Sequence, residues 1–215
     1  MRRLPGLLLL FLAFPAAAET LDCALIKSTT NPFELTLDST STKQGKEPVT
    51  TQTRRQINRK PDATVVYDIF SAAGFFLRRT YNNNAFVTES YFSTDKVRRV
   101  ASYSIDVNKD YFGLGQPFDF ALQMKDDNGK VGSEVNASIS FDGAVDIELG
   151  GCTYGLTKIV TMNKGVNNDK PFSNRSVTWY SRDLKTSLYS RVENSDGSSM
   201  EFRARGISTT VTPVE

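Results

Sequence analysis

Residues 131–149 read VGSEVNASISFDGAVDIEL, and the pattern of this stretch decides the fold. From Val131 to Phe141 the apolar side chains fall on odd-numbered positions, and the positions between them are polar or glycine. A period of two is typical of a β-strand with one buried and one solvated face. Residues 145–149 repeat the alternation after Asp142-Gly143, a pair that predicts a turn because glycine readily adopts positive φ. We therefore expect two antiparallel strands here.

The same alternation extends along the chain in both directions, for example over residues 33–38 and 200–205. Turn formers such as Asp127-Asn128-Gly129 and Asp196-Gly197 separate the runs, and the polar stretches 40–48 and 162–171 are expected to be exposed loops. The spacing predicts about twelve strands joined mainly by hairpins. The fold class is therefore expected to be all-β with little helix, as an antiparallel meander that forms a curved half-barrel or a β-sandwich.

The N-terminus has the pattern of a cleaved secretory signal. Arg2 and Arg3 precede the apolar run 7–14, and Ala16-Ala17-Ala18 supplies small residues before Glu19. The run is far shorter than the about 20 residues that a spanning helix needs. Asp22 is a poor fit directly before a lipidated cysteine, so a soluble mature protein is favoured over a lipoprotein. We predict a signal peptide over residues 1–18 and a periplasmic or secreted location.

Residues 19–215 are predicted to form a single all-β domain, or two lobes with a seam near 111–117, where Gly113 and Gly115 interrupt the pattern. The two cysteines, Cys23 and Cys152, are too far apart for a C-x-x-C motif, and a disulfide between them is the default in an oxidising compartment. A pair of free thiols is the alternative, but no histidine is present to activate either sulfur.

The charge balance argues against nucleic acid as a partner. The whole chain has 26 basic and 24 acidic residues, and removal of Arg2 and Arg3 with the signal leaves 24 of each. A neutral mature chain gives no electrostatic reason to bind nucleic acid or an anionic membrane surface.

The residue types also limit the possible chemistry. The chain contains no histidine, which removes Ser-His-Asp and Cys-His nucleophile systems and most catalytic zinc sites. We therefore predict no enzyme activity, no cofactor and no metal site. A carbohydrate-active enzyme with two carboxylates, such as Asp142 and Asp146, is the alternative that this pattern leaves open. Asp106, Asn108 and Asp110 match the opening of a calcium-binding loop, but Pro117 occupies the position of its bidentate glutamate.

Aromatic side chains give the most direct hint of a ligand, because a curved antiparallel sheet can enclose an apolar cavity. The alternative is that these rings only fill the core. Arginine doublets, such as Arg54-Arg55 and Arg78-Arg79, add a second hint, because neighbours in a strand point to opposite faces and one member of each doublet is then partly covered. Such cations suit an anionic glycan or a lipid head group. The candidate cavity residues are Phe75, Phe76, Phe118, Phe120, Tyr154 and Trp179.

The second half of the chain resembles secreted proteobacterial β-sheet proteins whose fold is similar to the LolA-like half-barrel carriers. The resemblance covers roughly residues 113–208 and implies an unclosed barrel that holds acyl chains in an apolar concavity. No counterpart of the lid helices of those carriers is found, and no functional residue is carried over. The segments that carry the resemblance are 115–118 (GQPF), 147–154 (IELGGCTY), the strand 156–162, 177–185 (VTWYSRDLK), and the hairpin of 186–194 and 199–207 about Asp196-Gly197.

These observations favour a non-catalytic periplasmic protein that binds a lipid-like or amphipathic ligand or an envelope partner. The alternative is a structural or protein-interaction module of the cell envelope without a small-molecule ligand. A membrane-spanning barrel is not expected, because Arg98, Arg99 and Glu134 interrupt the apolar bands that lipid-facing strands require.

Overall fold

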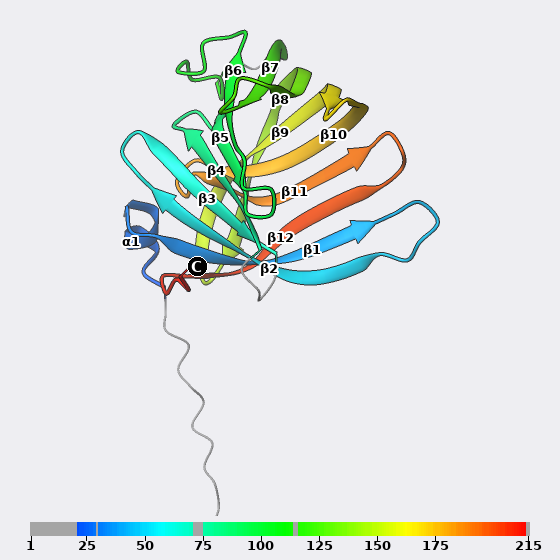
Figure 1. The fold of residues 1–215 in the computed structure, drawn as a ribbon. Helices are drawn as coiled ribbons and strands as arrows, with labels where there is room; N and C mark the ends of the chain where they lie inside the picture. The colour runs from blue at the N-terminus through cyan, green and yellow to red at the C-terminus, as the bar shows by residue number, and fades with distance from the viewer. Residues whose placement is uncertain (1–20, 29, 71–74, 114–115, 214–215) are drawn as a thin grey trace, which may run out of the picture.

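The computed structural model describes residues 21–28, 30–70, 75–113 and 116–213. This part of the chain is all-β and antiparallel, with one six-residue helix before the first strand (Figure 1). Of the helices in this part, none has the length and apolarity that a membrane crossing needs. The elements are α1 (Cys23–Ser28), β1 (Phe33–Thr42), β2 (Val49–Arg59), β3 (Ala63–Ile69), β4 (Phe76–Asn82), β5 (Val87–Phe92), β6 (Arg98–Tyr103), β7 (Phe118–Asp126), β8 (Val131–Leu149), β9 (Cys152–Asn167), β10 (Lys170–Ser181), β11 (Thr186–Asn194) and β12 (Ser199–Ser208).

The twelve strands form one closed barrel in which each strand pairs with its sequence neighbours and β1 also pairs with β12. Figure 1 shows β12 lying beside β1, the contact that closes the sheet. The expectation of a half-barrel or a sandwich is therefore wrong, whereas the all-β antiparallel class is confirmed. Alternation along one strand determines which face is buried, but it carries no information about whether the first and last strands meet.

Two predicted breaks in the sheet are also wrong. Asp142-Gly143 is a bulge within the single long strand β8, where the pairing with β9 shifts between Phe141 and Ala144 and Gly143 has a φ of 77°. The predicted loop 162–171 is mostly strand, because β9 and β10 meet in a tight turn in which Asn168 and Asp169 both have positive φ. Asparagine and aspartate tolerate this conformation better than other non-glycine residues, so the turn needs no longer connection.

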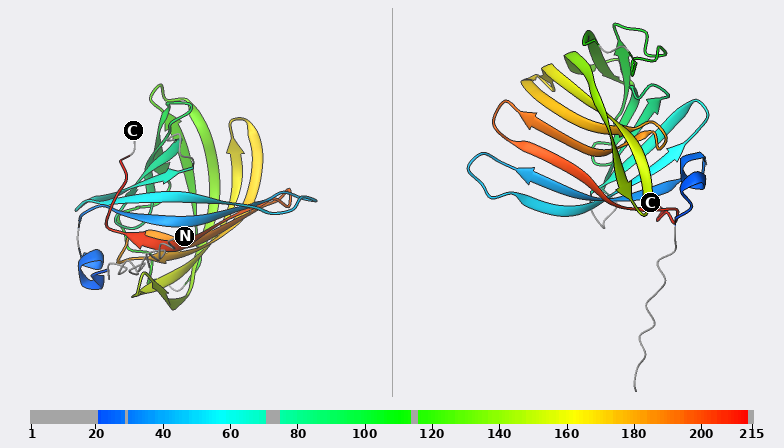
Figure 2. Two further views of the ribbon diagram at one scale, coloured as in Figure 1. Left: turned by 90° about the horizontal axis from the view of Figure 1, so that it is seen from below. Right: turned by 180° about the vertical axis from the view of Figure 1, so that it is seen from behind.

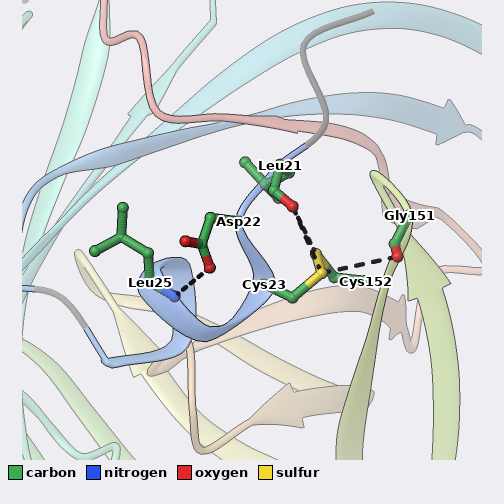
Figure 3. The surroundings of a disulfide bond; sticks show 6 residues. All are labelled: Leu21, Asp22, Cys23, Leu25, Gly151 and Cys152. Atoms are coloured by element: carbon green, nitrogen blue, oxygen red, sulfur yellow. Dashed lines mark hydrogen bonds between the residues drawn. A yellow bond between two sulfur atoms is a disulfide. The ribbon is translucent and has the colours of Figure 1, made fainter.

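The N-terminal helix is joined covalently to the far end of the β8–β9 hairpin. Cys23 and Cys152 form a disulfide with their Cα atoms 5.4 Å apart, which confirms the predicted pairing (Figure 3). The Asp22 carboxylate accepts a hydrogen bond from the Leu25 amide and caps the helix. The view from behind in Figure 2 shows this hairpin running down to the C-terminal end of the described chain. A six-residue helix is too short to show a helical period in the sequence.

The main core lies inside this end of the barrel. Strand β1 turns Phe33, Leu35 and Leu37 inward, and each is at most 1% exposed. Ile26 of α1 and Tyr154 of β9 are fully buried in the same cluster. The core therefore fixes α1, the first strands and the β8–β9 tip together, and the remaining interior of the barrel is free for a cavity.

Candidate ligand cavity

The barrel interior contains a cavity of about 410 Å³ whose lining residues come from strands β2–β12 and from adjoining turns. Small-molecule sites have volumes of about 300–1,000 Å³, so the space is large enough for one ligand. Its lining is not uniform. One part, on β6–β9, is mainly apolar, and another part, on β2–β4, is charged. Around the barrel, β5 separates the two parts on one side, and β10, β11, β12 and β1 separate them on the other.

The apolar wall is the first of these parts. Phe86 in the β4–β5 turn packs edge-to-face on Tyr103 and Phe120, with ring centroids 5.4 and 5.9 Å apart. Such edge-to-face pairs stabilise an aromatic cluster beyond the area that they bury. The residues of the apolar wall are Tyr103, Phe120, Leu122, Ile139, Phe141 and Ile159.

The charged wall consists of Arg55, Asp68 and Arg79, one residue from each of three neighbouring strands. Arg55 and Asp68 are directly paired in the β2–β3 register, and the Arg55 Nε lies 2.5 Å from Asp68 Oδ1. Arg79 Nη1 lies 3.3 Å from the other oxygen, Oδ2, of the same carboxylate. One carboxylate therefore serves two guanidinium groups, and the group carries a net positive charge inside the barrel.

Arg55 has a further partner across the interior. Its Nη1 donates to the hydroxyl and to the carbonyl oxygen of Ser187 on β11, at 2.8 and 3.2 Å. Arg55 and Asp68 are both less than a tenth exposed, and these contacts supply the hydrogen bonds that buried charged groups need. The Arg79 side chain is 35% exposed and lines the cavity.

Lys185 adds another cation at the β10–β11 turn. It adopts a φ of 52°, and its Nζ donates to Asn83 Oδ1 of the β4–β5 turn at 2.8 Å. This bond joins two turns that are more than 100 residues apart in sequence. Among the described residues, no carboxylate lies within ion-pair distance of Lys185.

The loop between β6 and β7 contributes Phe112 to the cavity lining. Phe112 lines the cavity and stacks on Tyr180, with ring centroids 5.5 Å apart. The Arg182 guanidinium lies over the Phe112 ring, and its Nη2 is 2.8 Å from Asp110 Oδ2. A hydrogen bond from the Phe112 amide, and then the ion pair with Arg182, lower the pKa of the Asp110 carboxyl. These contacts hold Phe112 against the barrel.

Two of the tyrosines that line the cavity, Tyr103 and Tyr180, carry neutral hydroxyl groups. Burial raises the pKa of the Tyr103 and Tyr180 hydroxyls above the ordinary tyrosine value. The Tyr103 hydroxyl donates to the Val87 carbonyl oxygen at 2.7 Å. A neutral phenolic hydroxyl can both donate and accept hydrogen bonds.

The aromatic residues predicted from the sequence are distributed over several parts of the molecule. Phe120 lies in the apolar wall, and Phe118 is beside it, with ring centroids 6.1 Å apart. Tyr154 is in the buried core, and Trp179 packs against that core without being among the cavity-lining residues. Phe75 and Phe76 also lie outside the cavity lining, where Phe75 contacts Phe92 and Phe76 contacts Tyr67 and Tyr91.

The carboxylates considered for catalysis or for calcium lie elsewhere. Asp142 and Asp146 are exposed on β8. Asp106 accepts a hydrogen bond from the Asn108 amide, as expected of a turn residue. In the part of the chain that the structure describes, no group of three or more His, Cys, Asp or Glu side chains is placed to hold a metal ion.

Sequence reasoning did not place Asp68 or Lys185 in the site. The doublets Arg54-Arg55 and Arg78-Arg79 did carry a usable signal, because in each the second arginine lines the cavity and the first is paired with a glutamate, Glu34 or Glu89. What the sequence could not supply is the register that places Asp68 between two of these arginines.

Comparison with known proteins gives distant structural neighbours. No protein-family model matches the chain, and no curated protein matches it. Among solved structures, the hypothetical lipoprotein YmcC from Escherichia coli (K12) is 8% identical, with a TM-score of 0.43 over 83% of this chain and 89% of the other. A "putative outer membrane lipoprotein-sorting protein domain" from Vibrio parahaemolyticus is 10% identical, with a TM-score of 0.34 over 86% and 88%. A DUF1329 family protein from Desulfovibrio piger is 11% identical, with a TM-score of 0.34 over 89% and 91%.

These neighbours agree with the weak resemblance to LolA-like carriers that the sequence showed. With all three TM-scores below 0.5 and identities of 11% or less, the likeness carries no argument about ligand or mechanism. The cavity of this chain is therefore the feature that bears on its function.

Proposed function

We propose that this chain is a non-catalytic binding protein of the periplasm or of the secreted fraction, and that it holds an amphipathic, lipid-like ligand inside its barrel. The single observation that carries the proposal is the cavity of about 410 Å³ inside the barrel, with an apolar wall and a separate charged wall. A purely structural barrel has no need of such a space, because interiors normally pack to the density of organic crystals.

The two walls together suit a molecule that is apolar at one end and polar at the other. An acyl chain buried against Phe120, Ile139 and Ile159 is stabilised by removal of its surface from water, at about 25 cal/mol per Å². A polar head group has hydrogen-bond partners on the charged wall and on the Ser187 side of the barrel. The predicted signal peptide, residues 1–18, lies outside the described residues and supports export of the protein.

The test is native mass spectrometry of the mature chain, residues 19–215, purified from the periplasm before and after denaturing extraction. A co-purifying lipid-sized mass that leaves on unfolding supports the proposal. An unliganded mass that stays unchanged when fatty acids or phospholipids are added contradicts it, and then favours the alternative of a protein-interaction module.

A filled-cavity variant gives a second, independent test. Ala137 lines the cavity and is 5% exposed, so Ala137→Phe is expected to occupy part of the space and to abolish ligand retention. Ala121, on the neighbouring strand β7, is exposed, so Ala121→Phe adds the same side chain outside the cavity. Retention should survive Ala121→Phe. Equal retention by both variants contradicts a ligand in the barrel. Trp179 lies outside the cavity lining, so mass spectrometry or calorimetry is preferable to tryptophan fluorescence.

A further inference from the structure

We infer that the ligand is an anionic amphiphile whose carboxylate or phosphate head group binds Arg79 and Lys185. This inference rests on the proposed function and specifies its ligand class. It comes from the charges that line the cavity: three cations, Arg55, Arg79 and Lys185, and one carboxylate, Asp68. The cavity thus carries an excess of two positive charges.

An excess of charge in a largely apolar cavity is unfavourable unless a counter-charge is present. Removal of a charge from water costs free energy unless the charge is paired and hydrogen-bonded. The outward-facing arginines next in sequence do not share this excess, because Arg54 pairs with Glu34 and Arg78 pairs with Glu89. An anionic ligand inside the barrel would neutralise the excess there.

Arg79 is the more accessible of the two guanidinium groups. The Arg55 side chain is 8% exposed and donates to Asp68 and Ser187, whereas the Arg79 side chain is 35% exposed, lies 3.3 Å from Asp68 Oδ2 and is also hydrogen-bonded to the Tyr81 side chain. A guanidinium has five N–H donors, and about a third of the Arg79 side chain is accessible. Because Arg79 lines the cavity, a carboxylate or phosphate inside the barrel can accept the remaining donors as charge-assisted hydrogen bonds.

Lys185 provides a second cation for the same head group. Its Nζ bonds to the neutral amide oxygen of Asn83, and an ammonium has three donors, so two remain for a ligand. The head group is thus expected near β4 and the β10–β11 turn. The tail then extends along the apolar wall on β6–β9.

The test uses probes that share one dodecyl tail and differ in the head group: dodecanoate, dodecyl phosphate, dodecanol and dodecyltrimethylammonium. Each is titrated calorimetrically into delipidated mature protein at about pH 8, below its micelle concentration. We expect dodecanoate and dodecyl phosphate to bind about tenfold or more tightly than dodecanol, and the cationic probe to bind most weakly. The ratio of the two anionic probes distinguishes a fatty acid from a phosphorylated lipid as the source.

Variants assign the effect to the two cations. Arg79→Gln and Lys185→Gln are each expected to weaken dodecanoate binding about tenfold and to leave dodecanol binding unchanged. Arg205→Gln is the matched control, because Arg205 is an exposed arginine with one carboxylate partner, Asp38, outside the cavity lining. Circular dichroism establishes that each variant is folded, and Lys185→Gln decides the test if Arg79→Gln fails to fold.

Two outcomes overturn the inference in distinguishable ways. If dodecanol and dodecanoate bind equally well, or if folded Arg79→Gln and Lys185→Gln bind dodecanoate as the natural sequence does, the head-group assignment is wrong and the proposed function stands. If none of the four probes binds, both the inference and the proposed function fail.

Discussion

Arg59 holds helix α1 through the carbonyl oxygen of Ile26, to which its Nη2 donates at 2.7 Å. The same guanidinium donates to the carbonyl oxygens of Lys27 and Asp183, and it lies 5.0 Å from the centre of the Phe33 ring. One buried side chain thus joins α1, the end of β2 and the β10–β11 turn. Burial lowers the pKa of Arg59, an effect that the nearby Tyr154 opposes.

Replacement of Arg59 should therefore destabilise the fold. Arg59→Met keeps most of the side-chain volume but leaves three carbonyl oxygens without this donor, and we expect a loss of about 2–4 kcal/mol in the free energy of unfolding. Urea denaturation followed by circular dichroism measures the change. Arg54→Met is the control, because Arg54 is a partly exposed member of an ion pair with Glu34 and should cost less than about 1 kcal/mol. Equal losses in the two variants would refute the role of Arg59.

Removal of the disulfide should have a larger effect. Cys23 and Cys152 are 129 residues apart in sequence, and closure of so long a loop is worth about 4–5 kcal/mol on the chain-entropy model. We expect Cys23→Ala/Cys152→Ala to lose stability of that order, measured by urea denaturation without reductant. The mass of the natural protein should increase by two hydrogens on reduction. An unchanged mass, or a double variant as stable as the natural protein, would contradict the bond.

Gly165 should not tolerate a side chain. A Cβ atom at this position would overlap the carbonyl oxygen of Glu134 and would lie 2.9 Å from the Cα of Val135, both on the backbone of β8. We expect Gly165→Ala to lower the stability by about 1–3 kcal/mol, because the two strands must move apart. Gly155→Ala on the same strand places its Cβ 3.5 Å from the nearest atom, Asp146 Oδ1, and should change the stability by less than about 0.5 kcal/mol. Thermal denaturation of the two variants compares them, and the reverse order would show that the β8–β9 spacing is wrong.

The Asp110 carboxyl group, which contacts Arg182 and the Phe112 amide, should titrate below the ordinary range of aspartate pKa values. Its folded-state pKa is lowered first by the Phe112 amide and then by Arg182, so this contact stabilises the fold at neutral pH and is lost as the pH falls through the lowered pKa. NMR titration of the side-chain carboxyl carbon should give a midpoint below the ordinary aspartate range. Arg182→Gln should raise the midpoint only part of the way, because the bond from Phe112 remains. A midpoint in the ordinary range would mean that the loop is not held in this way.

The sequence predicted the strands better than their connections. Alternation placed Phe33, Leu35 and Leu37 on one buried face, and β1 shows this pattern. Asp142-Gly143 has the composition of a turn, but the strands on either side continue into each other because β9 offers a continuous partner across the bulge. Local composition favours both outcomes, and the long-range pairing decides between them.

The sequence predicted the types of residue that form the candidate site, but not which of these residues lie next to each other. Aromatic content and arginine doublets both indicated a ligand, and Phe120, Arg55 and Arg79 line the cavity. The charged wall depends on the register of β2, β3 and β4, in which Arg55 faces Asp68 and Val66 faces Arg79. A shift of one of these strands by one residue would turn its charged side chain to the other face, and the charged wall would be lost.

The pairing of β1 with β12 also dictates an order of events during biogenesis. The strand that starts at Phe33 acquires one of its two neighbours only when the strand that ends at Ser208 is present. Until then, one edge of β1 has unpaired backbone N–H and C=O groups, which can pair with another chain. Contacts between such distant segments form slowly, because the loop-closure entropy is lost before the contacts can compensate for it. A chain truncated before Ser199 should consequently remain open and prone to aggregation, and newly made protein needs protection from self-association until its last strand is available.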